Sequence, residues 1–170
     1  MSEKKLLLNE QDIELKIQRL SYEVAERYFD KKELYIFGIK EQGYKLAERI
    51  IKELQTLSDC KLYLHSISVN KQNPIGSIHT DIQNLNQLKN KDILIIDDVL
   101  NSGKTLFYAL QPFIQVPIAS LKVLVLVNRS HQQFPVYPEF VGTTLSTTYQ
   151  NHIEADLKNK KQSKVYLLNK

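Results

Sequence analysis

The stretch DILIIDDVLNSGKTL, residues 92–106, decides how the rest of the sequence is interpreted. After Asp92 come four apolar, β-favouring residues, and this apolar run ends at two adjacent acids, Asp97 and Asp98. Residues 102–105, which follow shortly afterwards, read SGKT and resemble part of a phosphate-binding loop. One short turn therefore combines two carboxylates with a candidate phosphate site.

Three interpretations of this turn compete. A nucleotide P-loop needs a glycine five residues before its Gly-Lys-Ser/Thr, and Asp98 stands at that position instead. A plain helix-capping turn, in which acids and a serine precede a helix, remains open. In the third interpretation, backbone N–H groups at a helix N-terminus and the hydroxyls of Ser102 and Thr105 hold a monophosphate, while Gly103 lets the ligand approach the backbone. The carboxylates, as acceptors, then take hydrogen bonds from vicinal hydroxyls, and ribose 5-phosphate has that shape.

The composition of the chain limits the possible classes of protein. Its 170 residues fit one domain with a core, and its 42% hydrophobic and 25% charged residues are ordinary for a globular protein. A net charge of +4 suits an anionic ligand but is too small to imply nucleic-acid binding. The single cysteine, Cys60, excludes an internal disulfide framework. No apolar run approaches membrane-spanning length, so we expect a cytoplasmic protein without a membrane partner.

Hydrophobic periodicity predicts alternating helices and strands. A first helix is capped by Asn9 and Asp12, and its apolar residues recur at helical spacing: Ile13, Ile17, Leu20, Val24 and Phe29. Further helices are predicted at 43–54 and 103–114, and strands at 33–40, 60–69, 92–96 and 120–127. The polar stretch 70–90 is typical of a long functional loop. The tail has a predicted turn at Val141 and Gly142, and a last apolar run at 164–169.

This order of elements predicts an α/β fold with a central parallel sheet flanked by helices. Several strands are apolar throughout, as expected when both faces of a sheet are covered. We expect a single domain, 1–170, with its core at about 30–128, an irregular C-terminal hood at about 129–170, and the N-terminal helix packed on the core. Ligands bind at the carboxyl ends of such strands, where the sequence places Gly38, Asp97, Asp98 and Asn128.

Residues 93–105, ILIIDDVLNSGKT, resemble the phosphoribosyl-pyrophosphate (PRPP) motif of the type I phosphoribosyltransferases. That motif has four hydrophobic residues, two acids, a hydrophobic residue, two variable residues, Thr or Ser, Gly, any residue and Thr, and every defined position matches. Residues 9–27, 38–50 and 124–142 are similar, in the same order, to the pyrimidine operon attenuator proteins that double as uracil phosphoribosyltransferases. The resemblance spans most of the chain and implies the type I phosphoribosyltransferase fold.

The resemblance implies transfer of phosphoribose from PRPP to a nucleobase, with uracil favoured, release of pyrophosphate, and Mg²⁺ bound with PRPP. Asp97, Asp98 and Asn101 are the implied catalytic residues, and the two aspartates contact the ribose hydroxyls. No direct metal ligand is assigned, although Asp97 and Asp98 are candidates. The implied 5-phosphate site consists of Ser102, Gly103, Lys104 and Thr105. The implied pyrophosphate loop consists of Lys40, Glu41, Gln42 and Gly43.

Three positions depart from the pattern of the relatives. Gln42 stands where the loop usually reads GIKTRG, so one cationic contact to the diphosphate is missing. Asn101 stands where purine-using relatives have an aspartate that acts as a general base, and an asparagine cannot accept that proton. In the implied lid, Lys71 is the only cation of the segment NKQN, and a solvated surface lysine is the alternative interpretation.

The implied nucleobase site lies after the last core strand. Its candidates are Asn128, Arg129, Phe140, Val141 and Gly142. Where relatives read PTSRSE this chain reads LSTTYQN, so an arginine is absent and the base is not fixed.

The family also implies partners other than small molecules. A homodimer is expected by analogy. RNA binding is possible but not favoured, because the cations of the first helix, Lys16, Arg19 and Arg27, alternate with acids. The alternative to an enzyme is an RNA-binding regulator of pyrimidine gene expression that senses PRPP or nucleotides, with weak or no catalysis.

Overall fold

The computed structural model describes residues 4–70, 78–146 and 151–169. Its elements in chain order are β1 (Lys4–Leu8), α1 (Glu10–Arg27), β2 (Glu33–Ile39), α2 (Gln42–Leu57), β3 (Lys61–Val69), β4 (Ile78–Thr80), η1 (Leu85–Leu88), β5 (Asp92–Leu100), α3 (Lys104–Ala109), η2 (Phe113–Gln115), β6 (Ser120–Arg129), β7 (Phe140–Leu145), β8 (Asn151–Asp156), η3 (Lys160–Gln162) and β9 (Lys164–Asn169). None of the helices in these described ranges is long and apolar enough to span a bilayer.

The predicted central parallel sheet is confirmed. Six strands run in the order β4-β3-β2-β5-β6-β7, and every neighbouring pair is parallel except β3 and β4. β5 lies inside this sheet, and its residues from Ile93 to Ile96 are fully buried. The continuous apolar run of β5 follows from burial on both faces.

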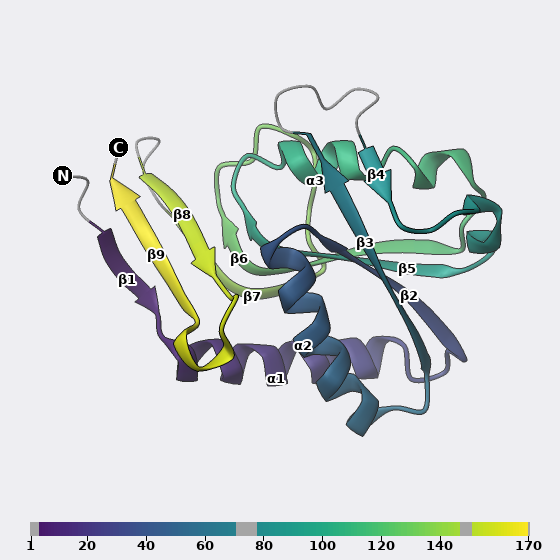
Figure 1. The fold of residues 1–170 in the computed structure, drawn as a ribbon, viewed down its shortest axis with the longest axis horizontal. Coiled ribbons are helices and arrows are strands. Elements are labelled where there is room, and N and C mark those ends of the chain that lie inside the picture. The colour runs from purple at the N-terminus through teal and green to yellow at the C-terminus, as the bar shows by residue number, and fades with distance from the viewer. Residues whose placement is uncertain (1–3, 71–77, 147–150, 170) are drawn as a thin grey trace.

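Helices cover both faces of the sheet (Figure 1). Alternate residues of β5 divide between two cores: Leu94 and Ile96 pack with α1 and α2, whereas Ile93 and Ile95 pack with α3 and η2. The predicted capping box begins α1, because Asn9 and Asp12 exchange side-chain to backbone hydrogen bonds of 3.0 Å. This arrangement leaves the carboxyl ends of β2 and β5 open at one edge.

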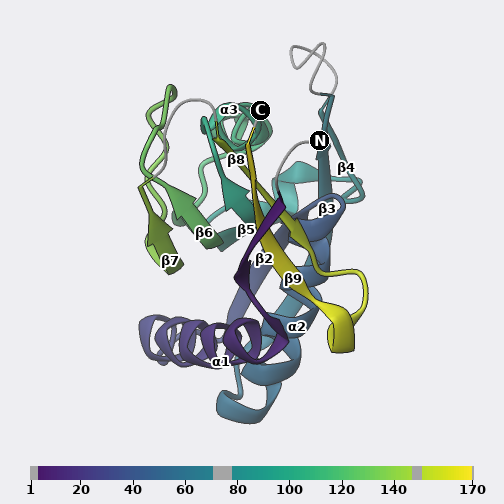
Figure 2. The same ribbon diagram turned by 90° about the vertical axis from the view of Figure 1, so that its left-hand side faces the viewer.

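The hood is a regular sheet, which corrects the prediction of an irregular cap. β1, β9 and β8 form a three-stranded antiparallel sheet, so the hood contains both an N-terminal and two C-terminal strands. Figures 1 and 2 show β1 and β9 side by side, apart from the main sheet. β7 lies within the stretch that we assigned to the hood, but it pairs with β6 in the main sheet.

Three further local predictions are wrong. No turn occurs at Val141 and Gly142, because both lie inside β7, where Gly142 packs closely against the backbone of Leu126. Phe29 is 81% exposed, since α1 ends at Arg27. The helix predicted at 103–114 stops at Ala109 and is followed by the short η2, with a proline, Pro112, at its start.

Candidate functional site

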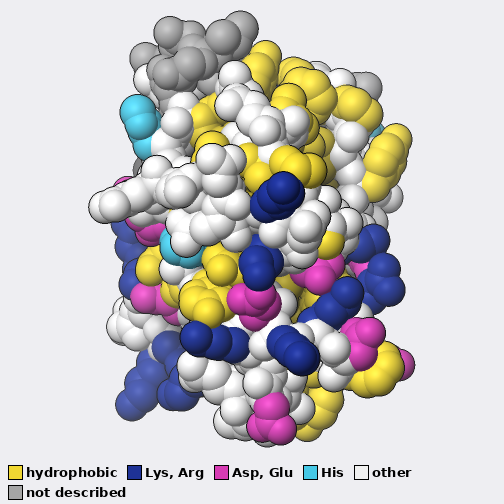
Figure 3. Space-filling model, turned by 90° about the vertical axis from the view of Figure 1, so that its right-hand side faces the viewer, with side chains coloured by type: hydrophobic (Ala, Val, Ile, Leu, Met, Phe, Trp, Pro, Cys, Tyr) yellow, Lys and Arg dark blue, Asp and Glu magenta, His cyan; other side chains and the backbone are white. Residues whose placement is uncertain are grey.

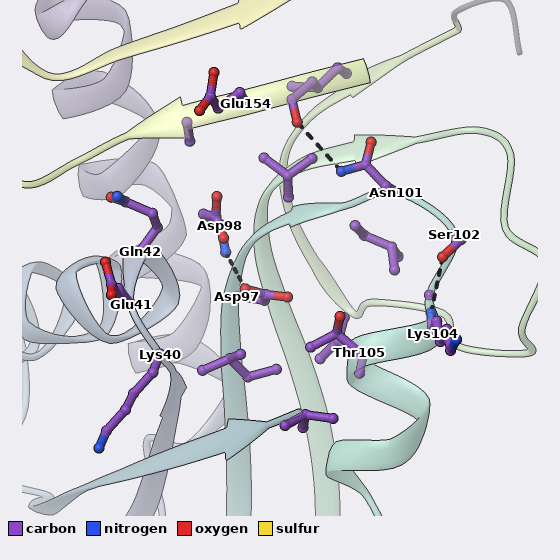
Figure 4. Close-up of a pocket in the computed structure, with 18 of the residues that line it drawn as sticks. Lys40, Glu41, Gln42, Asp97, Asp98, Asn101, Ser102, Lys104, Thr105 and Glu154 are labelled. Carbon is purple, nitrogen blue, oxygen red and sulfur yellow. Dashed lines mark hydrogen bonds between the residues drawn. The ribbon is translucent and has the colours of Figure 1, made fainter. Parts of the chain in front are cut away.

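A cavity of about 650 Å³ lies at the carboxyl edge of the main sheet. Its walls come from the end of β2, the end of β5, the first turn of α3 and the hood strand β8 (Figure 4). The residues that line it are Ile39, Lys40, Glu41, Gln42, Val69, Asp97, Asp98, Val99, Leu100, Asn101, Ser102, Gly103, Lys104, Thr105, Leu106, Tyr108, His152, Ile153, Glu154 and Ala155. The cavity therefore brings together most of the residues that the sequence singled out.

The two aspartates differ in their surroundings. Asp97 is 7% exposed, and its Oδ1 accepts a hydrogen bond of 3.0 Å from the backbone N–H of Asp98. Asp98 is only half-buried. Consecutive residues of a strand point to opposite faces, so the two carboxylates enter the cavity at different angles. Figure 4 shows both at the end of β5.

The predicted phosphate loop opens the short helix α3. Gly103 has φ of +83°, a left-handed conformation that a side chain would strain. The hydroxyl of Ser102 accepts a hydrogen bond of 3.3 Å from the N–H of Lys104, while its carbonyl accepts bonds from Gln133 and Phe134 at 2.8 and 3.1 Å. The loop is thus held from both sides. α3 has only six residues, so its helix dipole is small, and any anion at this loop would depend mainly on the loop amides and hydroxyls.

The predicted pyrophosphate loop joins β2 to α2. The peptide bond between Lys40 and Glu41 is cis, and both side chains are exposed at the mouth of the cavity. Gly43 does not line the cavity. A Cβ at Gly43 would lie 2.9 Å from the Cα of Asp97 and 2.7 Å from the carbonyl oxygen of Ile96, so glycine is what lets α2 begin directly against β5.

Two amide side chains connect these loops with the hood. The Oε1 of Gln42 accepts a hydrogen bond of 2.8 Å from the N–H of Leu157, just after β8. The Nδ2 of Asn101 donates to the carbonyl of Ile153 at 3.5 Å, and the Oδ1 of Asn101 is buried without a partner among the described residues. Polar atoms that are buried without a partner are rare, so this oxygen is an unusual, unsatisfied acceptor in the cavity wall.

The structure does not bring the five predicted base-binding residues to the cavity. Phe140 is 4% exposed and packs in the core under α1. The carbonyls of Val141 and Gly142 accept hydrogen bonds of 2.8 and 2.7 Å from the Arg19 guanidinium. Neither Asn128 nor Arg129 lines the cavity; Asn128 accepts a bond of 2.6 Å from Gln132, and Arg129 is 9% exposed. Their role toward a base stays a prediction.

Sequence reasoning missed the wall that β8 supplies. His152, Ile153, Glu154 and Ala155 line the cavity from the hood. Their alternating polar and apolar pattern was a usable strand signal, since Ile153 and Ala155 are buried while His152 and Glu154 are exposed. The predicted lid residue Lys71 lies outside the described residues.

The charges around the cavity bear on the predicted metal. Among the lining residues, the carboxylates of Glu41, Asp97, Asp98 and Glu154 outnumber the ammonium groups of Lys40 and Lys104. The described part of the chain contains no group of three His, Cys, Asp or Glu side chains that would hold a metal ion. Mg²⁺ commonly takes one or two carboxylates together with substrate phosphates, so these residues fit a Mg²⁺ ion that arrives with a phosphorylated substrate.

The chain resembles known proteins in sequence and in fold. A family model described as "Phosphoribosyl transferase domain" matches residues 4–160. The bifunctional protein PyrR of Clostridium beijerinckii is 30% identical over 165 residues, which cover 93% of each chain. The pyrimidine operon regulatory protein of Lactococcus lactis is 28% identical and is covered to 88%, as is this chain.

Solved structures share the architecture. A hypoxanthine-guanine phosphoribosyltransferase of Bacillus anthracis superposes with a TM-score of 0.73 at 16% identity, and 96% of this chain and 97% of that chain are covered. At this identity the similarity concerns the fold. Together with the family match and the PyrR relatives, the cavity residues lead to one conclusion: the chain belongs to the phosphoribosyl transferase family, in the branch of the PyrR proteins.

Proposed function

We propose that the protein transfers 5-phosphoribose from PRPP to a nucleobase and releases pyrophosphate, with uracil as the favoured base. One observation carries the proposal: Asp97 and Asp98, the loop at residues 102–105 and the loop at residues 40–42 line a single cavity. These are the parts that a bound PRPP requires, namely acceptors for two ribose hydroxyls, a site for the 5-phosphate and a site for the diphosphate.

In this proposal, the ribose is held at the end of β5. The carboxylates of Asp97 and Asp98 accept hydrogen bonds from the ribose hydroxyls, and the hydroxyls of Ser102 and Thr105 donate to the 5-phosphate. The bond between the ribose C1′ and the pyrophosphate oxygen breaks, a bond from C1′ to a nitrogen of the base forms, and the proton of that nitrogen is released to solvent. Positive charge that develops on the ribose is stabilised by the nearby carboxylates. Holding both reactants rigidly lowers the entropic part of the barrier.

The pyrophosphate leaves on the side of the cavity where Lys40 lies. Because acidic side chains predominate among the lining residues, Mg²⁺ bound with PRPP would neutralise the leaving group. The proposal for uracil rests on the PyrR branch and on Asn101, whose neutral amide cannot act as the proton acceptor that the resemblance assigns to purine-using relatives.

Pyrophosphate release tests this proposal. The purified protein is incubated with PRPP and Mg²⁺, and uracil, hypoxanthine, guanine, xanthine, adenine and orotate are added singly. We expect release with uracil and none with the doubly substituted control Asp97→Asn, Asp98→Asn, which should also lose PRPP binding by calorimetry while retaining its circular dichroism spectrum. Undiminished PRPP affinity in the folded control would refute the site assignment.

The names of the relatives support a second candidate function. "Pyrimidine operon regulatory protein" and "Bifunctional protein PyrR" suggest a regulator that senses PRPP or nucleotides and binds RNA, with weak or no catalysis. On one face, however, basic side chains alternate with acidic ones (Figure 3), and cations form ion pairs such as Lys31 with Asp92 at 3.2 Å. Such a surface attracts RNA less than a continuous basic one.

RNA binding separates the two candidates. Saturable PRPP binding without pyrophosphate release in the presence of any base, together with RNA binding that weakens steeply with salt, would favour the regulator.

By analogy with the family, we also propose a homodimer, for which sedimentation velocity is the direct test.

A further inference from the structure

The side chain of Gln42 contacts the hood instead of pointing only to the cavity. Gln42 is the first residue of α2, and its Oε1 accepts a hydrogen bond of 2.8 Å from the backbone N–H of Leu157. Leu157 directly follows β8 and is 2% exposed. Since a buried N–H without an acceptor is costly, this bond fixes the end of β8 relative to the loop at residues 40–42.

The opposite end of the same wall is held by the other PRPP loop. Asn101 donates to the carbonyl of Ile153 at 3.5 Å, which is the longer and weaker of the two bonds. Between these two contacts, β8 passes along the cavity and contributes Ile153, Glu154 and Ala155 to its lining. Figure 4 shows Gln42 and Asn101 below the strand that carries Glu154, with Gln42 toward the arrowhead of β8 and Asn101 toward its beginning.

The chemistry of the contact depends on the residue type at position 42. Leu157 presents an N–H donor, so its partner must be an acceptor. Glutamine has a carbonyl oxygen for this purpose, whereas arginine has only donors. The arginine that the resemblance leads one to expect at this position therefore could not make the bond.

We propose that Gln42 is a positioning residue that fixes β8 as the nucleobase-facing wall of the cavity, which rests on the proposed function. In the proposed complex, the ribose and phosphate groups of PRPP lie at the carboxyl ends of β2 and β5. The part of the cavity lining that comes from β8 is not supplied by the proposed PRPP loops. A base placed beside the ribose therefore meets β8. Gln42 thus contributes to recognition of the base through the hood, in place of a cationic contact to the diphosphate.

Three substitutions of Gln42 separate its role in the hood from any role toward PRPP. Gln42→Met keeps the length but removes the acceptor. Gln42→Glu keeps an acceptor and adds a negative charge near the diphosphate site. Gln42→Arg introduces a cation and removes the acceptor. Hydrogen–deuterium exchange of the Leu157 amide reports the bond directly, and steady-state kinetics with PRPP and the base varied separately report its consequence.

We expect faster exchange at Leu157 in Gln42→Met and Gln42→Arg, and near-normal exchange in Gln42→Glu. The KM for the base should rise roughly tenfold in Gln42→Met, as expected when a buried donor loses its acceptor, with little change in PRPP affinity. Gln42→Glu should restore the KM for the base but weaken PRPP binding, and Gln42→Arg should strengthen PRPP binding. A purely structural role would change thermal stability without this division between base and PRPP.

The outcomes distinguish the two proposals. Faster exchange at Leu157 with an unchanged KM for the base would overturn the positioning role, and unchanged exchange in Gln42→Met would show that the bond does not hold the hood. If the wild-type protein binds PRPP but turns over no base, the proposed function fails. In that case the positioning role falls with it, whatever the exchange of Leu157 shows.

Discussion

The Oδ1 of Asp97 accepts a hydrogen bond of 3.0 Å from the backbone N–H of Asp98. The side chain of Asp97 is buried, with 7% exposure, whereas that of Asp98 is half-buried. We therefore expect the two adjacent acids to have different roles. Asp97 helps to shape the end of β5, and Asp98 is the more available acceptor for a ligand.

This difference predicts unequal effects of two matched substitutions. Asp98→Asn should reduce PRPP affinity at least tenfold while lowering the free energy of unfolding by no more than about 0.5 kcal/mol, as is usual away from buried features. Asp97→Asn should reduce PRPP affinity and also lower the free energy of unfolding by about 1–2 kcal/mol, because a charge-assisted bond at a buried site is weakened. Calorimetry with PRPP and urea unfolding measure the two effects. Equal stability losses would contradict the division.

A methyl group at Gly43 should displace the backbone of β5 at Asp97. Gly43→Ala places a Cβ 2.9 Å from the Cα of Asp97, so α2 or the end of β5 has to shift. Gly142→Ala is the matched control, because its Cβ would meet the carbonyl oxygen of Leu126 at 2.4 Å, away from the cavity. Both variants should lose about 1–3 kcal/mol of unfolding free energy. Only Gly43→Ala should weaken PRPP binding by the folded protein, as measured by calorimetry below the unfolding transition.

The hydroxyl of Thr105 should contribute to phosphate binding without stabilising the fold. Thr105→Val keeps the shape and removes the donor, so the KM for PRPP should rise about tenfold. Thr144→Val on β7, outside the cavity, is the control and should leave the KM unchanged. An unchanged KM in Thr105→Val would remove this hydroxyl from the proposed phosphate site.

Substitution of Asn101 should alter the choice of base. Asn101→Asp replaces the amide that donates to Ile153 with a carboxylate, which repels that carbonyl but can accept a proton. We expect kcat/KM for uracil to fall several-fold and its ratio to kcat/KM for hypoxanthine to fall further. Asn101→Ala removes the same hydrogen bond without adding a proton acceptor, so the difference between the two variants gives the effect of the carboxylate alone. The same uracil-to-hypoxanthine ratio in both variants would exclude this effect.

The junction of α1, α2 and the hood should weaken in acid. Burial raises the pKa of the Glu14 carboxyl, but hydrogen bonds from Lys160 and Arg49 outweigh burial and bring the pKa below its usual value. A depressed folded-state pKa stabilises the fold in full above the unfolded value of about 4.3, and this contribution is lost as the pH falls through the folded value.

Glu14→Gln should therefore cost about 1 kcal/mol of unfolding free energy at pH 7 and progressively less below pH of about 4. Urea unfolding from pH 7 to pH 3 measures the gap between the variant and the wild type. Glu48→Gln, which breaks an exposed pair with Lys45, is the control and should cost about 0.5 kcal/mol or less at every pH. A gap for Glu14→Gln that does not change with pH would rule out the carboxylate as its source.

Local features of this chain could be predicted from the sequence, while long-range pairings could not. The apolar run of β5, the acids at its end and the SGKT loop lie within fifteen consecutive residues, and their meaning does not depend on distant parts of the chain. The capping box of α1 is local for the same reason. These elements agree between sequence and structure except at the end of β5, which was predicted at Ile96 but continues through both acids to Leu100.

The hood and the cavity wall that β8 supplies depend on contacts between distant segments. β1 is five residues long, which is too short for a clear strand pattern. Its partner β9 lies near the other end of the sequence, so no neighbouring segment indicates the pairing. β7 was missed because Gly142 resembles a turn residue, whereas here a glycine is needed for close approach to Leu126. The contact between Gln42 and Leu157 joins two segments that no local pattern relates.

The pairing of Leu6 with Tyr166 has a consequence for how the protein is made. A ribosome releases β1 first, but β1 has to wait for β9 before it can join a sheet. The main sheet is complete once β7 has emerged, so the loops that we propose bind PRPP can form on the nascent chain before the hood does. The cavity wall from β8, which we propose faces the base, is therefore assembled only after β9 has emerged and joined the hood.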